Sequence, residues 1–159
     1  MKNKRVILGI VLVGVILSVI GILLIRSIYS SLSAKDFKEH FGALGYTVSD
    51  KETPEFDTGT SYQVATKEDV PYKFVYYEFD DEVEAKIVYE KYKEANNIRK
   101  YITSESKNNE TYGALFAKTV VKSENEYIVI SRVRKTIIFV ATTKEYTNEV
   151  DAILEEIGY

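Results

Sequence analysis

The sequence contains no cysteine, and this absence excludes several kinds of site. Without cysteine the chain forms no disulfide and cannot carry a lipid on a cysteine side chain. It also lacks the cysteine ligands of common zinc sites, and its single histidine, His40, cannot replace them. We therefore expect no metal and no cofactor.

Acidic residues are absent from the first 33 positions, where one long apolar run stands out. Residues 6–25 carry no charge, and Ser18 is their only polar side chain. At about 1.5 Å per residue, a helix over this run spans about 30 Å, the thickness of the hydrocarbon core of a bilayer. The run predicts a transmembrane helix that binds the lipid bilayer.

A cleaved signal peptide is the alternative interpretation of the same run. The apolar part of a signal peptide is usually about 7–15 residues long, which is shorter than residues 6–25. Ser31 and Ser33 precede Ala34 at the spacing of a cleavage site, but they lie far from the start of the run and beyond Arg26. These features favour an uncleaved signal anchor.

The basic residues around the run predict its orientation. Lys2, Lys4 and Arg5 precede it, whereas Arg26 is the only basic residue close behind it. Basic residues favour the cytoplasmic side, so we expect a single-pass protein of the cell membrane with a cytoplasmic N-terminus. The expected parts are a cytoplasmic N-terminus at residues 1–5, a transmembrane helix at 6–25, a short linker at 26–32 and one extracytoplasmic domain at 33–159.

The predicted domain is acidic. From residue 33 onward the sequence has 17 basic and 24 acidic residues, and 17 minus 24 gives a formal charge of −7. This charge argues against nucleic acid and against anionic lipid headgroups as partners. Residues 33–159 are numerous enough for one domain with a hydrophobic core.

Apolar residues at helical spacing predict three helices in the domain. The first covers residues 33–44, with Ser33 as its cap and Gly45 in the left-handed conformation at its end. The second begins at the acidic cluster of residues 80–84, because carboxylates stabilise a helix N-terminus. The last covers residues 144–157, with a capping box made by Thr142 and Glu145 and with Gly158 at its end.

Runs of β-branched and aromatic residues predict the strands. Residues 104–111 are polar and are expected to be a mobile loop, whereas residues 134–135 are expected to be a tight hairpin turn. The resulting α+β class has one N-terminal transmembrane helix followed by a largely antiparallel sheet packed with about three helices. Predicted strands lie at residues 62–66, where we expect a sheet edge, and at 72–79, 112–121, 127–133 and 136–142.

The main strands are apolar on both sides. In residues 72–79, for example, Tyr72, Phe74 and Tyr76 face one side. Val75, Tyr77 and Phe79 face the other side. A sheet with one wet face should alternate apolar and polar residues. Either the helices divide between the two faces, or loops cover one face, or a protein partner or second copy binds there.

The layout resembles small uncharacterised bacterial proteins that carry one N-terminal anchor before an extracytoplasmic α+β domain. The features that carry the resemblance are KNKR before the apolar run, the segment SAKDFKEHFGALGYTV and the ending ILEEIGY. The resemblance covers most of the chain and implies an anchored domain, but it implies no activity.

Three groups of side chains are candidates for chemistry. We interpret His40 as a half-exposed structural residue, because it has no cysteine or histidine partner for metal binding. The acidic cluster Asp80, Asp81, Glu82 and Glu84 lacks the spacing of a calcium loop, so we interpret it as helix capping. The basic residues Arg132, Arg134 and Lys135 are interpreted as a solvated turn.

No catalytic, cofactor-binding or metal-binding residue is predicted, and the domain is more plausibly not an enzyme. The sequence favours a membrane-anchored extracytoplasmic interaction or envelope-accessory module without catalysis. Its expected partners are the lipid bilayer, through residues 6–25, and a protein or second copy, through a sheet face. The alternatives are a ligand-binding or sensor domain and an envelope hydrolase whose carboxylates are brought together by folding.

Overall fold

The computed structural model describes residues 30–53, 59–95 and 107–159. The chain divides into two compact units, residues 1–30 and 31–159, and every element below belongs to the second unit. Among the described residues, no helix is both long and apolar enough to cross a bilayer. The transmembrane helix predicted at residues 6–25 lies outside the described residues.

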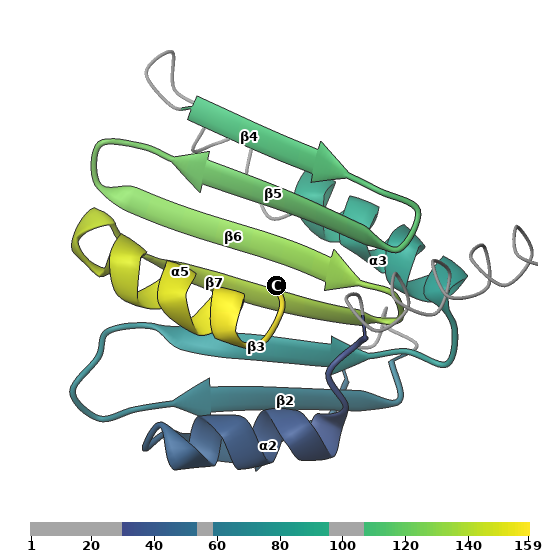
Figure 1. Ribbon diagram of the computed structural model, residues 1–159, viewed down its shortest axis with the longest axis horizontal. Coiled ribbons are helices and arrows are strands. Elements are labelled where there is room, and N and C mark those ends of the chain that lie inside the picture. The colour runs from purple at the N-terminus through teal and green to yellow at the C-terminus, as the bar shows by residue number, and fades with distance from the viewer. Residues whose placement is uncertain (1–29, 54–58, 96–106) are drawn as a thin grey trace, which may run out of the picture. The chain divides into compact units, whose positions relative to one another are not determined.

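The described part of the second unit has the predicted α+β class. Its seven strands form one antiparallel sheet in the order β1-β2-β3-β7-β6-β5-β4 (Figure 1). The strands are β1 (Thr47–Asp50), β2 (Ser61–Thr66), β3 (Lys73–Glu78), β4 (Lys107–Tyr112), β5 (Phe116–Lys122), β6 (Glu126–Val133) and β7 (Thr136–Thr143). The helices are α2 (Ala34–Ala43), α3 (Glu82–Ala95) and α5 (Thr147–Glu156), with a 3-10 turn η1 (Lys144–Tyr146) before α5.

Helix α2 begins and ends as the sequence predicts. The Ser33 hydroxyl accepts a hydrogen bond from the Asp36 amide at 3.1 Å, which satisfies one of the free amides of the first turn. Gly45 follows the helix with φ +82°, a conformation that costs glycine nothing. The Tyr46 amide then donates to the Phe41 carbonyl at 2.9 Å and closes the helix end.

Helix α5 ends as predicted but begins differently. Gly158 has φ +81°, and the Tyr159 amide donates to the Leu154 carbonyl at 2.7 Å. The capping box expected at Thr142 is wrong, because β7 continues to Thr143, whose hydroxyl bonds the Glu145 side chain instead of a helix amide. The chain therefore enters α5 through the η1 turn, without a side-chain cap.

Two strand predictions need correction. The strand at residues 62–66 is not an edge strand, because β1 pairs with β2 on its outer side. The polar segment at residues 104–111 was expected to be a loop, yet residues 107–112 form β4 and pair with β5 along their whole length. The strand expected at residues 112–121 accordingly starts only at Phe116, after a turn closed by the Gly113 amide on the Phe116 carbonyl at 2.8 Å.

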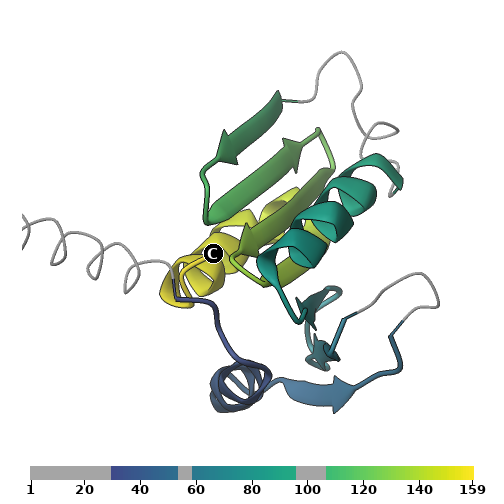
Figure 2. The ribbon, with the colours of Figure 1, turned by 90° about the vertical axis from the view of Figure 1, so that its right-hand side faces the viewer.

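The helices divide between the two faces of the sheet. Helices α2 and α5 cover one face, here called the two-helix face, and α3 covers the other, the one-helix face (Figures 1 and 2). This division accounts for the apolar residues on both sides of the strands, which was the first of the three explanations considered. Helices of the chain itself thus pack on both faces of the sheet, and each face contributes to the hydrophobic core.

On the two-helix face, aromatic rings join α2 to β3. Phe37 stacks on Tyr76 with 4.7 Å between ring centres, and Phe41 lies 4.8 Å from Phe74. Beside them α5 buries Val150, Ile153 and Leu154. On the one-helix face, α3 buries Ala85, Val88 and Tyr89 against apolar side chains of four strands. Those strand residues are Val75, Tyr77, Phe79, Ala117, Val121, Ile128, Ile130 and Ile137.

Candidate functional site

The fold brings together the acidic and the basic clusters of the sequence. Pairing of β3 with β7 places the end of β3 beside the turn between β6 and β7. There the Arg134 Nε lies 2.9 Å from the Glu82 Oε1, and the Lys135 Nζ lies 2.8 Å from the Glu78 Oε1. We call this group the charged rim; its members are Glu78, Asp80, Asp81, Glu82, Arg134 and Lys135.

The turn that carries Arg134 and Lys135 is held on both sides. The Arg134 amide donates to the Leu115 carbonyl at 2.6 Å, and the Lys135 carbonyl accepts from the Phe79 amide at 3.0 Å. Arg134 has φ +53°, a left-handed conformation that is uncommon for residues with a side chain. Hydrogen bonds to residues just outside β5 and β3 therefore hold the backbone of this tight turn, which the sequence predicted, and keep both cations in the charged rim.

The acidic cluster caps α3, as predicted. Asp81 Oδ1 accepts hydrogen bonds from the amides of Val83 at 2.8 Å and Glu84 at 2.9 Å. Next to this cap lies a surface cleft of about 270 Å³, lined by Ser31 together with five of the rim residues. Of its carboxylates, Glu82 faces the Arg134 cation and Asp81 faces backbone amides, which is the arrangement of a stabilised surface rather than of a pair of acids that exchange protons.

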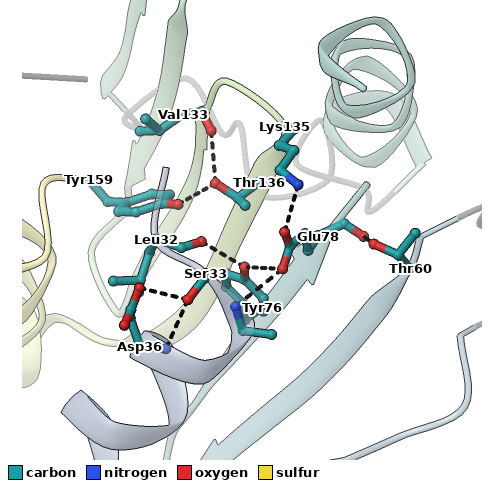
Figure 3. Close-up of polar contacts among 11 residues, drawn as sticks. Leu32, Ser33, Asp36, Thr60, Tyr76, Glu78, Val133, Lys135, Thr136 and Tyr159 are labelled. Carbon is teal, nitrogen blue, oxygen red and sulfur yellow. Dashed lines mark hydrogen bonds and ion pairs between the residues drawn. The ribbon is translucent and has the colours of Figure 1, made fainter. Parts of the chain in front are cut away.

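A second polar cluster holds the chain where it enters the domain, and we call it the junction (Figure 3). The Tyr76 hydroxyl donates to the Leu32 carbonyl at 2.7 Å. Glu78 Oε2 accepts from the Ala34 amide at 3.2 Å and lies 3.2 Å from the same Tyr76 hydroxyl. The junction is thus fixed to β3 through two side chains that are two residues apart and point to the same face.

Charges at the junction stabilise the ionised form of Glu78. Burial alone raises the pKa of Glu78, but hydrogen bonds from Lys135 and from the Ala34 amide outweigh it, so the pKa lies below the usual value. Burial raises the pKa of Tyr76, and the negative charge of Glu78 raises it further. The Tyr76 hydroxyl therefore keeps its proton and acts as a hydrogen-bond donor.

Tyr159 closes the junction from the other side. Its hydroxyl bonds the Thr136 hydroxyl, and Thr136 in turn donates to the Val133 carbonyl at 2.8 Å (Figure 3). Burial raises the pKa of Tyr159 to about 12, although hydrogen bonding with Thr136 and with the Leu32 backbone opposes that rise. Leu32 is held by Tyr76 through its carbonyl, and its backbone also lies beside the Tyr159 hydroxyl.

Arg132 differs from the other basic residues of its cluster. It was expected in a solvated turn, but it is only 3% exposed and lies on the one-helix face. Its Nη1 donates to the Arg134 carbonyl at 3.1 Å, while its Nε has no hydrogen-bond partner among the described residues. Burial lowers the pKa of Arg132, and the nearby Glu82 counteracts this. Arg132 therefore stabilises the backbone of the turn through its hydrogen bond to the Arg134 carbonyl.

His40 has a structural position, as the sequence predicts. It lies on α2, partly buried, and its Nε2 is 3.8 Å from the Glu156 Oε1 at the end of α5. Within the described residues, no group of three or more histidine, aspartate or glutamate side chains is arranged to hold a metal ion.

Sequence reasoning did not find the junction. Tyr76 and Glu78 were assigned to a strand, and Tyr159 was treated only as a residue after a helix end. One signal was available, because Glu78 is the only acidic residue in the otherwise apolar and aromatic end of β3. Its partner Ala34 lies 44 positions earlier, which no local pattern reveals.

Comparison with known proteins adds no identification. The chain matches no family model, and no curated protein or solved structure is significantly similar to it. The resemblance to anchored bacterial proteins therefore stays a prediction, and function has to be argued from the charged rim, the junction and the exposed surface.

Proposed function

We propose that the chain is a single-pass membrane protein whose domain, residues 33–159, acts outside the cytoplasm as an interaction module without catalysis. The apolar run at residues 6–25 supports the anchor, and the basic residues that precede it support a cytoplasmic N-terminus. The bilayer is the first partner, and a protein or a second copy of the chain is the second.

One observation carries the interaction part of the proposal. Val83 is 66% exposed and Ile87 is 51% exposed, although both are large apolar residues. They are four positions apart on α3 and so lie on the same side of the helix, away from Ala85 and Val88, which pack on the sheet. We call this pair the α3 ridge. Apolar residues at the centre of a contact commonly provide much of its binding energy.

The ridge replaces the sheet face as the proposed contact surface. A partner on a sheet face was expected because the strands are apolar on both sides, and the helices now account for that pattern. Helix α3 covers the one-helix face, so its outer side is the surface that a partner approaching that face meets first (Figure 2). A homodimer through this surface is part of the same proposal.

The site geometry favours this reading over a hydrolase or a sensor. In the charged rim, Glu78 and Glu82 are paired with cations, and Asp81 is engaged as a helix cap. A hydrolase would instead need carboxylates that converge on a substrate. Two surface clefts, the one of about 270 Å³ beside the charged rim and a second of about 250 Å³, are lined mostly by charged and polar residues, which include Lys122 and Lys144 in the second. Ligand sites are mostly apolar.

A cysteine-directed photo-crosslinker at Ile87 tests the proposal. Because the natural chain has no cysteine, Ile87→Cys introduces the only attachment point. In intact membranes we expect a discrete adduct, either with a second copy or with one other protein, and Val83→Glu should reduce its yield about tenfold, since a buried charge weakens an apolar contact.

Asn148→Glu serves as the matched control for this experiment. It adds the same single negative charge at an exposed helix position, but on α5 and so on the other face of the sheet, and it should leave the adduct yield unchanged. The proposal is contradicted if Ile87→Cys gives no adduct, or if both glutamate variants reduce the yield equally.

A further inference from the structure

The junction carries an inference about how the domain is joined to the chain that precedes it. Residues 31–33 have no regular secondary structure, yet polar groups in and next to this segment make specific hydrogen bonds. The Leu32 carbonyl, the Ser33 hydroxyl and the Ala34 amide all have partners at hydrogen-bond distance. Such bonding is unusual for a flexible linker, whose backbone is normally solvated.

We propose that residues 32–34 are a latch, closed by Tyr76, Glu78 and Tyr159, which makes the connecting segment part of the folded domain and shields the peptide bond between Ser33 and Ala34. The latch rests on the proposed function only in taking residues 6–25 as the anchor. Its consequence is that the ordered domain begins at residue 32, one residue before the predicted domain start.

One carboxylate organises the latch. Glu78 accepts the Ala34 amide on Oε2 and Lys135 on Oε1, and its Oε2 lies 3.2 Å from the Tyr76 hydroxyl, whose single proton points mainly to the nearer Leu32 carbonyl. Two donors from distant parts of the chain thus share one carboxylate, and Lys135 supplies the compensating charge. If Glu78 loses its charge, the grip on the Ala34 amide and on Lys135 weakens together.

The side chains that close the latch belong to the core. Tyr76 is fully buried and stacks on Phe37 of α2, and Tyr159 is 8% exposed. These rings cannot move independently of the sheet, because interior side chains are close-packed. The hydrogen bond from Tyr76 therefore ties the Leu32 carbonyl to a side chain that is fixed in the core.

The latch shortens the linker, and it bears on whether a signal peptide is cleaved off between Ser33 and Ala34. Only residues 26–31 remain between the predicted anchor and the latched segment, and they span at most about 20 Å when fully extended. Cleavage between Ser33 and Ala34 would separate α2 from its cap and the Leu32 carbonyl from Tyr76. The latch thus favours retention of the anchor over removal of a signal peptide.

Distance measurements by electron paramagnetic resonance test the latch in the full chain. Spin labels on Ser31→Cys and Asp69→Cys report the distance between the junction and the turn that connects β2 to β3, and no other cysteine competes for the label. In detergent we expect a single narrow distance distribution. Adding Tyr76→Phe with Glu78→Gln should broaden it at least about twofold, because a released segment of a few residues samples several ångströms.

Tyr46→Phe is the matched control. It removes a buried hydrogen bond between Tyr46 and Tyr72 on the same face, away from the junction, and should leave the distribution narrow. In the double variant, Tyr76→Phe keeps the ring and Glu78→Gln keeps the side-chain volume. Glu78→Gln alone is a milder variant, which should also broaden the distance distribution. Circular dichroism verifies that each variant is folded.

A second readout concerns the shielded bond. Elastase, which cuts after small residues, should leave the bond between Ser33 and Ala34 intact in the natural chain and cut it in the double variant. Equal widths and equal cutting in all variants would overturn the latch. A wrong membrane orientation would leave both readouts unchanged in detergent, so failure of the latch is distinguishable from failure of the proposed function.

Discussion

Replacing Phe41 by alanine is expected to lower the free energy of unfolding by about 3–5 kcal/mol, the usual cost of removing a buried phenylalanine. Phe41 is completely buried between α2 and the sheet. Its ring lies 4.4 Å from Phe37, 4.8 Å from Phe74 and 5.3 Å from Tyr46, measured between ring centres. Its loss leaves a cavity that several rigid rings cannot fill.

Chemical denaturation of the full chain in detergent measures this effect. Ile87→Ala is the matched control, because Ile87 is also a large apolar residue on a helix but is 51% exposed. It should change the free energy of unfolding by no more than about 0.5 kcal/mol. Similar losses for both variants would mean that α2 does not pack on the sheet as described.

Replacing Tyr159 by alanine is expected to cost about 3 kcal/mol, nearly as much. Tyr159 is buried, its hydroxyl bonds Thr136, and its backbone oxygen accepts from the Lys118 Nζ at 3.0 Å. The ring also supports Leu32 at the junction. The helix end formed by Gly158 therefore positions a core residue.

Tyr159→Phe separates the two contributions of this residue. It keeps the ring in place and removes only the hydroxyl, so we expect a loss of about 1 kcal/mol, the usual net value of one hydrogen bond. The two losses in the free energy of unfolding follow from the midpoints of denaturant unfolding, provided that the variants share the same dependence of that free energy on denaturant concentration. If Tyr159→Ala cost no more than Tyr159→Phe, the ring would not belong to the core.

Local signals in the sequence predicted the helices well. The apolar spacing of Phe37 and Phe41, the cap at Ser33 and the glycine at position 45 each act within one or two turns, and the structure confirms all of them. The capping of α3 by an aspartate was predictable for the same reason, since a helix N-terminus attracts acceptors wherever it lies.

Pairing between distant strands was not predictable in the same way. Strand β4 has a polar sequence without alternation, and it forms because β5 offers backbone partners along its length. The charged rim forms because β3 pairs with β7, and these two strands are far apart in the sequence. The junction depends on that same arrangement, so its residues carry no local signature.

The central claim is that an anchor at residues 6–25 holds the domain outside the cytoplasm, and reporter fusions after residue 159 test it most directly. Alkaline phosphatase is active only after export, whereas green fluorescent protein exported in unfolded form stays dark. We predict an active phosphatase fusion and a dark fluorescent fusion, both recovered with the membranes. A bright fluorescent fusion with an inactive phosphatase fusion would contradict the claim.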